Sequence, residues 1–271
     1  MYTVRDLLAV DAGKTLSDIA SIGFREVELF GFGGNILADN PLFGMSSAEF
    51  AAALENAGLT APIAHISGDA DNIPELAELA HAIGANHLVV SIAPEFLSFE
   101  DGKFEIRGVT GRDQLDRIAE RLNRQGEQCR ASGIGFGYHN HQMEFASLGD
   151  ENAYDYLMSQ ADADLVKLEL DVGWASIAGV DPASVIERYA GRVIACHLKD
   201  YDPSLPLPND LIRFPIPEQA QVVEPGAGQV DFGRVVAALD KAGVRHRFVE
   251  IDVTSEPMRA IREGYRHLTH L

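Results

Sequence analysis

The chain has 271 residues, of which 46% are hydrophobic, and a formal net charge of −19; this length is enough to bury one large core. The acidic balance disfavours duplex DNA and anionic membranes as partners, because both carry negative charge. The chain has two cysteines, an opening without an apolar signal-peptide core, and no apolar run near the ~20 residues that cross a bilayer. These features predict a cytoplasmic protein with free thiols.

Short aliphatic runs alternate with amphipathic ones along the whole chain. The aliphatic runs predict strands at Arg25–Phe30, Pro62–Ser67, Asn86–Ile92, Ile134–Asn140, Leu165–Asp171, Val193–Lys199 and Arg247–Asp252. The amphipathic runs predict helices at Leu16–Ile22, Ser47–Asn56, Pro74–Ile83, Arg112–Ala131, Glu151–Ser159, Pro182–Tyr189, Phe232–Ala242 and Pro257–His267. Glycines such as Gly58 and Gly243 follow helical patterns where a left-handed cap is expected.

Regular alternation of strand and helix predicts a parallel α/β fold. Seven strands are evident, and an eighth would be needed to close a (β/α)8 TIM barrel. We expect it at Met1–Arg5, as a short or truncated first strand. A doubly wound open sheet is the alternative, but no Gly-x-Gly-x-x-Gly fingerprint follows an early strand. No linker divides the sequence, so we expect a single barrel domain over residues 1–271.

Alternation within the strands separates an apolar face from a polar one. In Val193–Lys199, for example, Cys196 and Leu198 lie on one face, and His197 and Lys199 on the other. In a barrel the apolar face packs on the helices, and active sites lie at the carboxyl ends of the strands. The inward polar residues near those ends are Glu28, His65, Ser91, His139, His141, Asp171, His197, Lys199, Glu250 and Asp252, with Glu144 just beyond its strand.

Carboxylates that converge on one barrel mouth repel one another. Two unit charges ~4 Å apart at an effective dielectric of ~20 cost about 4 kcal/mol. A divalent cation removes that cost, and a mixture of imidazole and carboxylate suits Mn²⁺, Mg²⁺, Co²⁺ or Zn²⁺ without choosing among them. One divalent metal ion is therefore the expected cofactor. Lys167 and Glu169 lie deeper on their strand, and we expect them to form an internal ion pair instead.

Four segments together carry a family resemblance: Tyr138–Phe145, Asp171–Trp174, His197–Asp200 and Glu250–Asp252. They resemble the sugar phosphate isomerase/epimerase family, which belongs to the xylose isomerase-like TIM barrel superfamily. The likeness covers nearly the whole chain. It also implies the barrel fold that the alternation of strands and helices predicts.

The resemblance implies one divalent metal held by Asp171, His197, Glu250 and a carboxylate near the end of the fifth strand. Relatives carry a glutamate where this chain has His139, and the nearest carboxylate here is Glu144, five residues further on. Glu144 is therefore the expected fourth ligand, and His139 is the competing one.

What the resemblance implies for function is a metal-dependent isomerase or epimerase that removes a proton next to the carbonyl of a sugar or keto-sugar. Glu144 or Glu250 is the expected base, and His141 is its acid/base partner. The side chains expected to hold the substrate are Glu28, His65, Lys199 and Trp174. The alternative is a metal-dependent dehydratase or lyase on a keto-sugar or keto-inositol, because it shares the first step.

Other classes of protein fit the sequence less well. A nuclease like endonuclease IV has a histidine three residues after the metal-binding aspartate, where this chain has Trp174. A non-catalytic sugar-binding barrel would need broken metal ligands. We expect an uncharged small-molecule sugar as partner, no nucleic acid and no membrane, and a homo-oligomer is compatible with the sequence. The proline-rich run Leu205–Pro217 follows the seventh strand, with Met1–Arg5 counted as the first, and there it could cover the barrel mouth.

Overall fold

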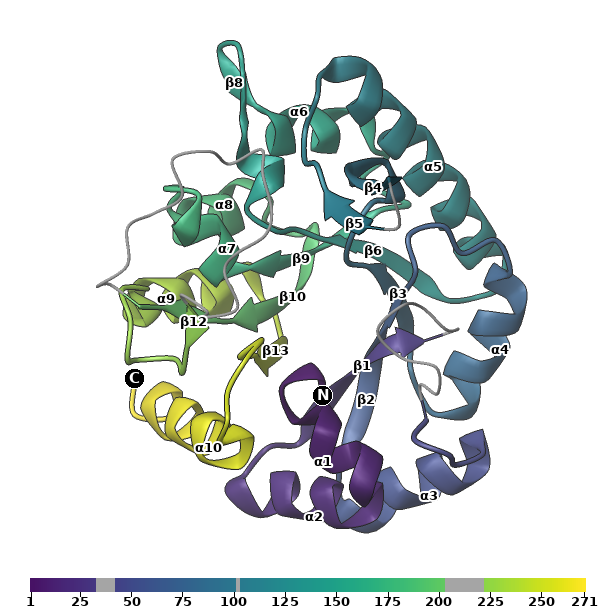
Figure 1. The fold of residues 1–271 in the computed structure, drawn as a ribbon, viewed down its shortest axis with the longest axis vertical. Coiled ribbons are helices and arrows are strands. Elements are labelled where there is room, and N and C mark those ends of the chain that lie inside the picture. The colour runs from purple at the N-terminus through teal and green to yellow at the C-terminus, as the bar shows by residue number, and fades with distance from the viewer. Residues whose placement is uncertain (33–41, 101–102, 203–221) are drawn as a thin grey trace.

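The computed structural model describes residues 1–32, 42–100, 103–202 and 222–271. Within these ranges, seven parallel strands form one sheet that curves into a nearly closed barrel (Figure 1). The order of the strands in the sheet is their order in the chain, which confirms the expected α/β TIM barrel. They are β1 (Glu26–Phe32), β2 (Thr60–Ile66), β3 (His87–Val90), β6 (Gly135–His139), β9 (Lys167–Asp171), β10 (Val193–Leu198) and β13 (His246–Val249). The run Leu205–Pro217 lies outside the described residues.

Helices surround the barrel on its outer side (Figure 1). They are α1 (Arg5–Val10), α2 (Ala12–Ile22), α3 (Ser47–Ala57), α4 (Ile73–Ala82), α5 (Arg112–Ala131), α6 (Ala153–Gln160), α7 (Val172–Ile177), α8 (Pro182–Arg188), α9 (Phe232–Ala242) and α10 (Pro257–Leu268). Gly58 and Gly243 end α3 and α9 in the left-handed conformation, with φ of +70° and +74°, as predicted. Across the described part of the chain, every helix is too short or too polar to cross a membrane.

Three short antiparallel pairs of strands accompany the barrel. They are β4 (Leu97–Glu100) with β5 (Lys103–Ile106), β7 (Ser147–Leu148) with β8 (Glu151–Asn152), and β11 (Asp200–Tyr201) with β12 (Val222–Val223). Each of the first strands, β4, β7 and β11, begins a few residues after a barrel strand ends. The pairs therefore belong to the loops at the carboxyl end of the barrel, the end that carries active sites in this fold.

The segment Met1–Arg5 is not the short first strand that the sequence predicts. Tyr2–Val4 forms a 3₁₀ helix, and α1 begins at Arg5. The segment lies in the opening between β1 and β13, where the N-terminal amine donates to the backbone oxygen of Glu28 at 2.9 Å and the Thr3 hydroxyl accepts from the backbone nitrogen of Ile251 at 2.9 Å (Figure 1). An amine and a hydroxyl thus bond one carbonyl of β1 and one N–H after β13 in place of a backbone strand.

Alternation of side chains divides the barrel into an outer and an inner face. Outward side chains such as Leu88 and Phe136 join the main hydrophobic core beneath the helices. Inward side chains in the middle of the barrel form a separate apolar cluster, made of Ile63, Val89, Ala195 and Phe248. We call this cluster the apolar floor. Two residues after each of these four positions the inward residue is polar, namely His65, Ser91, His197 and Glu250, so the polar site lies directly above the floor.

Candidate metal centre

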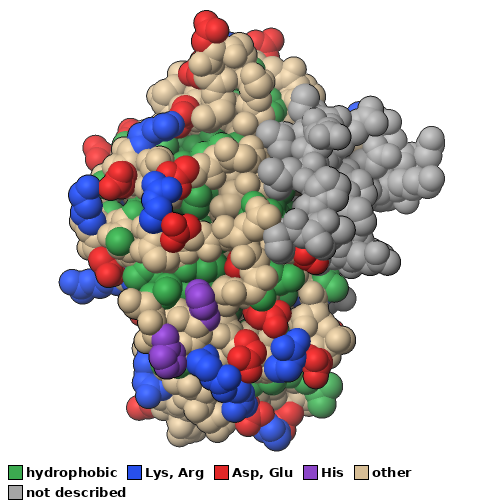
Figure 2. All heavy atoms as spheres, turned by 90° about the vertical axis from the view of Figure 1, so that its left-hand side faces the viewer, with side chains coloured by type: hydrophobic (Ala, Val, Ile, Leu, Met, Phe, Trp, Pro, Cys, Tyr) green, Lys and Arg blue, Asp and Glu red, His purple; other side chains and the backbone are tan. Residues whose placement is uncertain are grey.

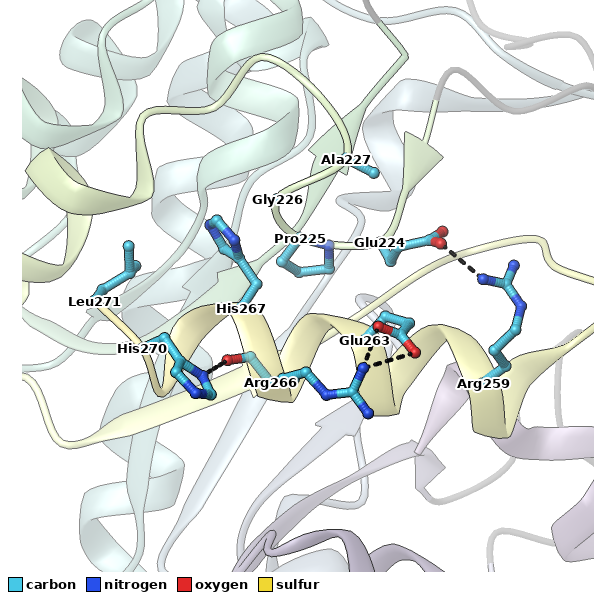
Figure 3. Close-up of a pocket in the computed structure, with 10 residues that line it drawn as sticks. All are labelled: Glu224, Pro225, Gly226, Ala227, Arg259, Glu263, Arg266, His267, His270 and Leu271. Carbon is cyan, nitrogen blue, oxygen red and sulfur yellow. Dashed lines mark hydrogen bonds and ion pairs between the residues drawn. The ribbon is translucent and has the colours of Figure 1, made fainter.

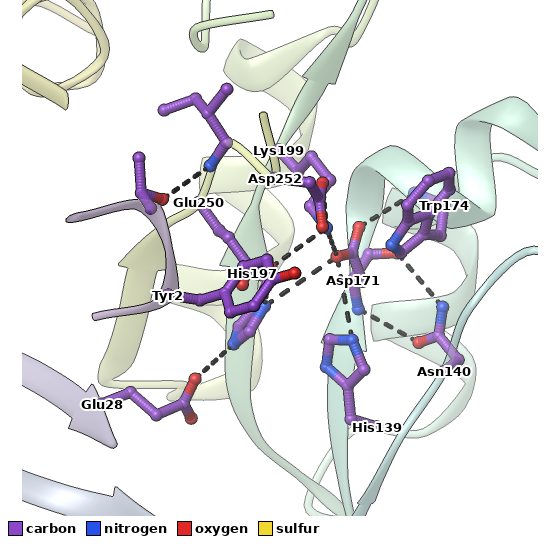
Figure 4. Close-up of polar contacts among 12 residues, drawn as sticks. Tyr2, Glu28, His139, Asn140, Asp171, Trp174, His197, Lys199, Glu250 and Asp252 are labelled. Carbon is purple, nitrogen blue, oxygen red and sulfur yellow. Dashed lines mark hydrogen bonds and ion pairs between the residues drawn. The ribbon is translucent and has the colours of Figure 1, made fainter. Parts of the chain in front are cut away.

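Polar and ionisable side chains gather where the barrel strands end (Figure 4). We call this set the polar cluster; its members are Glu28, His65, His139, Glu169, Asp171, His197, Lys199, Glu250 and Asp252. Glu250 and Asp252 are partly exposed, whereas each of the others is at most 8% exposed. The members come from six parts of the barrel: β1, β2, β6, β9, β10 with the residue after it, and the residues after β13. The cluster therefore exists only because the barrel forms.

The deeper part of the cluster consists of His65, His139, Glu169 and His197. Their ligand atoms all lie within 4.8 Å of one another, and all four residues are buried, so this group is able to hold a metal ion. The Glu169 carboxylate is 2.5 Å from His65 Nε2 and 3.4 Å from His139 Nδ1 and from His197 Nε2. A buried carboxylate is therefore surrounded by three imidazoles.

The outer part consists of Asp171, His197 and Glu250, which also bring one ligand atom each within 4.8 Å of the others. His197 Nδ1 lies 2.8 Å from Glu250 Oε2 and 3.9 Å from Asp171 Oδ2. The other oxygen of Asp171 accepts from the backbone nitrogen of Trp174 at 2.9 Å and so caps α7. This bond holds the carboxylate with Oδ2 directed into the cluster (Figure 4).

Lys199 is the cation of the outer part and is only 1% exposed. Its Nζ lies 3.0 Å from Asp171, 3.0 Å from Glu250 and 2.9 Å from Asp252, and 4.7 Å from the centre of the Trp174 ring. Burial alone would lower the pKa of Lys199, but the three carboxylates outweigh it and raise this pKa well above its ordinary value. The lysine is therefore charged at neutral pH.

The pKa values of two neighbouring imidazoles in the cluster are shifted in opposite directions. Burial would lower the pKa of His65, but Glu28 and Glu169 outweigh it and raise this pKa to about 10. Burial and the charge of His197 lower the pKa of His139 to about 4. Groups whose surroundings separate their pKa values in this way are a feature of functional sites.

The chemistry of the cluster fits the divalent metal that the fold family implies. Three of its buried atoms, His139 Nδ1, Glu169 Oε1 and Asp171 Oδ2, take part in no hydrogen bond within the described residues, although each lies within 3.4 Å of another ionisable side chain. Buried polar atoms are normally hydrogen-bonded, so such atoms are suited to a ligand. Imidazole nitrogen and carboxylate oxygen are the donors that Zn²⁺, Co²⁺ and Mn²⁺ accept.

Glu144 does not join either group of ligand atoms. It lies in a 3₁₀ helix, Met143–Phe145, and is fully buried. Its carboxylate accepts from the hydroxyl of Tyr138 at 2.6 Å and from the backbone nitrogen of His141 at 2.9 Å. Burial raises the pKa of Glu144 to about 7. The structure thus brings His139, and not Glu144, to the remaining expected ligands.

The expected acid/base residue His141 lies beside the cluster, whereas the expected substrate residues Glu28 and His65 are members of it. The His141 ring stacks on Trp174 at 5.8 Å between centres and contacts His139 edge-on at 5.2 Å. Burial and the charge of His139 hold the pKa of His141 well below its ordinary value. Glu28 accepts from His197 Nε2 at 2.6 Å, and His65 lies 3.3 Å from Glu28. Both are therefore inside the cluster rather than at its rim.

The expected ion pair between Lys167 and Glu169 is wrong. Lys167 donates to the backbone oxygen of Ala163 at 2.8 Å, whereas Glu169 faces the three histidines. Glu169 is the cluster residue that sequence reasoning missed. The alternation of β9 already indicates that it points inward, but only the register, in which His139 stands opposite Glu169, reveals that it is level with the histidines.

An open pocket of about 660 Å³ lies elsewhere, between α10 and the loop that precedes α9 (Figure 3). Its cations are already engaged, since Arg259 pairs with Glu224 at 3.1 Å and Arg266 with Glu263 at 3.1 Å. The residues that line the pocket include no member of the polar cluster. We therefore assign no role to the pocket in the chemistry of the cluster.

The fold and the cluster define a class: a TIM barrel with buried histidines and carboxylates at the carboxyl ends of its strands. The particular family follows from comparison, because residues 16–271 match the model of the xylose isomerase-like TIM barrel family. The chain belongs to that family.

Three similar proteins illustrate the likeness. Inosose dehydratase of Lacticaseibacillus casei is 26% identical over 188 residues, which are 68% of this chain and 62% of the relative. The match thus spans less than two thirds of that relative. The structure of a sugar phosphate isomerase/epimerase from Parabacteroides distasonis has a TM-score of 0.77 at 20% identity, covering 100% of this chain and 94% of the other. An L-ribulose 3-epimerase has a TM-score of 0.66 at 16% identity, covering 95% and 87%. At these identities the two structures show the fold alone.

Proposed function

We propose that this protein is a metal-dependent enzyme that removes a proton next to the carbonyl of an uncharged sugar or keto-sugar, as an isomerase or epimerase does. The observation that carries the proposal is the convergence of Asp171, His197 and Glu250 on one buried point above an apolar floor. These residues would hold the metal. A bound divalent ion would supply Lewis acidity for the carbonyl and the neighbouring hydroxyl of the substrate.

Glu250 is the carboxylate we propose as the base. The Glu250 side chain is 15% exposed, whereas the side chains of Glu169 and Asp171 are fully buried. A substrate that enters from the carboxyl end can therefore reach Glu250. Lys199 holds Glu250 ionised: burial would raise the pKa of this carboxyl, but Lys199 and His197 outweigh it and keep the pKa well below its ordinary value. An ionised, reachable carboxylate is what proton abstraction needs.

His141 is the acid/base partner in this proposal. Its low pKa makes the imidazole neutral near pH 7, so the ring can accept or return a proton. The stack on Trp174 fixes the plane of the ring, and the bond from the His141 backbone nitrogen to Glu144 fixes its loop. In this role Glu144 acts through His141 and does not contact the reacting carbon.

The charge of the cluster favours a substrate without phosphate. Among the described members of the polar cluster, Lys199 is the one lysine or arginine, and it already faces three carboxylates. A phosphate would meet net negative charge there. Over the face drawn in Figure 2, acidic and basic side chains are interspersed rather than gathered into a basic area, which also gives no support to a nuclease.

Dehydration of a keto-sugar or keto-inositol is the second candidate. It begins with the same proton abstraction and then expels a hydroxyl group, which needs a proton donor. Lys199 is a charged donor 3.0 Å from Glu250, and the inosose dehydratase of L. casei is a relative. Both observations favour this outcome, and neither excludes isomerisation.

One experiment tests the shared first step. The purified protein, loaded with Mn²⁺ or Zn²⁺, is incubated in D₂O with ketohexoses and keto-inositols, and proton NMR follows loss of the signal from the carbon beside the carbonyl. We expect exchange that stops with EDTA and returns with metal. Exchange that continues undiminished after complete metal removal would contradict the proposal. The products then distinguish epimer, aldose and dehydrated ketone.

A further inference from the structure

We propose that His139 and His197 both bind the metal through the nitrogen that faces Asp171, and that the deeper carboxylates Glu169 and Glu28, held by His65, fix the opposite nitrogen of each ring as a hydrogen-bond donor. The inference rests on the metal site of the proposed function and goes beyond it. It assigns each ring nitrogen of the two histidines and gives the three deeper residues a positioning role.

The two histidines are arranged alike. His197 directs Nδ1 toward Asp171 Oδ2 at 3.9 Å and Nε2 toward Glu28 at 2.6 Å. His139 directs Nε2 toward the same Asp171 oxygen at 3.9 Å and Nδ1 toward Glu169 at 3.4 Å, where no hydrogen bond is formed in this structure, so the proposal requires this contact to shorten when the metal binds. Each imidazole therefore has one nitrogen in the outer group and the other nitrogen beside a deeper carboxylate.

The distances between side-chain atoms distinguish the shortest contacts from the separations that one shared ion would give. Two atoms that each lie ~2.1 Å from one ion are about 3 to 4.2 Å apart, whatever the coordination number between four and six. The separations of both imidazoles from Asp171 fall in that interval. The 3.4 Å between His139 Nδ1 and Glu169 also falls in it, so the assignment for His139 rests on Nε2 facing the same Asp171 oxygen as His197 does. His197 Nδ1 and Glu250 are 2.8 Å apart and would have to separate slightly around a shared ion. The contacts of His65 with Glu169 at 2.5 Å and of His197 with Glu28 at 2.6 Å are shorter and fit charge-assisted hydrogen bonds.

His65 offsets the negative charge of the two deeper carboxylates. Its Nε2 lies 2.5 Å from Glu169 and 3.3 Å from Glu28, so one imidazole contacts both buried carboxylates. A carboxylate that accepts the second ring proton of a metal-bound histidine fixes the tautomer and raises the basicity of the ligand. Loss of such a partner weakens metal binding by about 10- to 100-fold.

The first test identifies the nitrogen that binds. The full chain is labelled with ¹⁵N-histidine, loaded with diamagnetic Zn²⁺ and studied by long-range ¹H–¹⁵N NMR, with His139→Asn and His197→Asn spectra for assignment. We expect a proton on Nε2 of His197 and on Nδ1 of His139, and no metal shift at His65. A metal-shifted His65, or a metal-shifted Nε2 of His197, would put the ion in the deeper group and overturn the proposal.

The second test measures affinity by competition with a chelator, together with metal content. Glu28→Gln should weaken Zn²⁺ binding about tenfold, because the amide oxygen still accepts but the charge is lost, and Glu28→Leu should weaken it further. The matched control is Glu26→Gln on the same strand, because Glu26 also bonds a histidine, His246, at 2.8 Å but lies outside the cluster. Circular dichroism checks that each variant is folded.

The outcomes keep the two proposals apart. A wild-type protein that binds no divalent ion would refute the metal claim of the proposed function itself. One ion per chain with equal affinity in the wild type, Glu28→Gln and Glu28→Leu would refute only the positioning role. Two ions per chain, one of them lost in His65→Gln, would show that the deeper group binds metal itself and would likewise overturn the inference.

Discussion

Single residues in this protein carry charge states that their surroundings impose. Glu144 and Lys199 are the clearest cases, because both are almost fully buried. Lys199 faces carboxylates of opposite charge, whereas Glu144 contacts a neutral hydroxyl. The positions of such residues can be predicted only in part from the sequence. The motif residues Asp171, His197 and Glu250 could be predicted because each ends or follows an aliphatic strand. Glu144 could not, since its distance from the cluster depends on the 3₁₀ turn that it occupies.

Glu144 predicts a pH dependence of stability. Its pKa is about 7 in the folded protein against an ordinary 4.5, so unfolding releases a proton from it between these values and the folded state loses stability as pH rises from 4.5 to 7. The loss is on the order of 3 kcal/mol. In Glu144→Gln the amide oxygen can still accept from the His141 backbone nitrogen, while the amide NH2 can donate to the Tyr138 oxygen, so the variant should remove this part of the pH dependence.

The measurement is urea denaturation of both proteins at pH 5 and pH 8. We expect Glu144→Gln to gain stability relative to the wild type at the higher pH, while the exposed control Glu120→Gln follows the wild type. An identical change for all three proteins between the two pH values would refute the assigned protonation state.

Lys199 predicts a different kind of loss. Lys199→Met removes the cation that contacts Asp171, Glu250 and Asp252, and breaking a buried pair of this kind costs about 3–5 kcal/mol. Because a metal also offsets these carboxylates, the loss should be larger with EDTA than with saturating Zn²⁺. Calorimetry under both conditions measures it. Lys241→Met is the control, since the Lys241 side chain is 76% exposed, and its loss should not depend on metal.

At the scale of elements, the sequence predicted the seven barrel strands and most of the helices to within a few residues. It missed α1 and α7, because each has only six residues and too little periodicity to be recognised. It misassigned Met1–Arg5, because that prediction came from the need for an eighth strand to close the barrel and not from a strand pattern in the segment itself. The relative register of strands, which makes Glu169 level with His139, is likewise absent from local patterns.

Asp200 joins two elements and supports a prediction at this scale. Its carboxylate accepts from the backbone nitrogens of Gly226, Gly228 and Val230, in the loop that leads to α9. A Cβ at Gly228 would lie 2.2 Å from an oxygen of Asp200, so the loop fits closely around the carboxylate. Asp200→Asn keeps the volume but replaces one acceptor with a donor.

We expect Asp200→Asn to cost on the order of 3 kcal/mol, because at least one part-buried N–H loses its acceptor and the charge of the buried carboxylate is gone. Asp231→Asn is the matched control, since Asp231 only caps α9 through one bond to Arg234 and asparagine is an equally good cap. Denaturant unfolding compares the two variants. Equal losses would mean that Asp200 does not hold the loop.

At the scale of the whole molecule, we propose one domain that depends on its metal. The cluster draws on strands from β1 to the residues after β13, so an ion bound there stabilises the entire barrel. We predict one calorimetric transition, with a midpoint that falls when EDTA removes the metal. An ion at 100 times its Kd adds about 2.7 kcal/mol. Two separate transitions would contradict the single domain, and an unchanged midpoint would contradict tight binding.

The apolar floor has a consequence for turnover. Ile63, Val89, Ala195 and Phe248 pack together in the barrel interior beneath the cluster and so close the centre of the barrel below it. In the proposed enzyme a substrate would enter at the carboxyl end and its product would leave by the same end, so the product would depart before the next substrate binds. Product should therefore compete with substrate for one form of the enzyme, and conversion in a closed vessel should slow before the equilibrium ratio is reached.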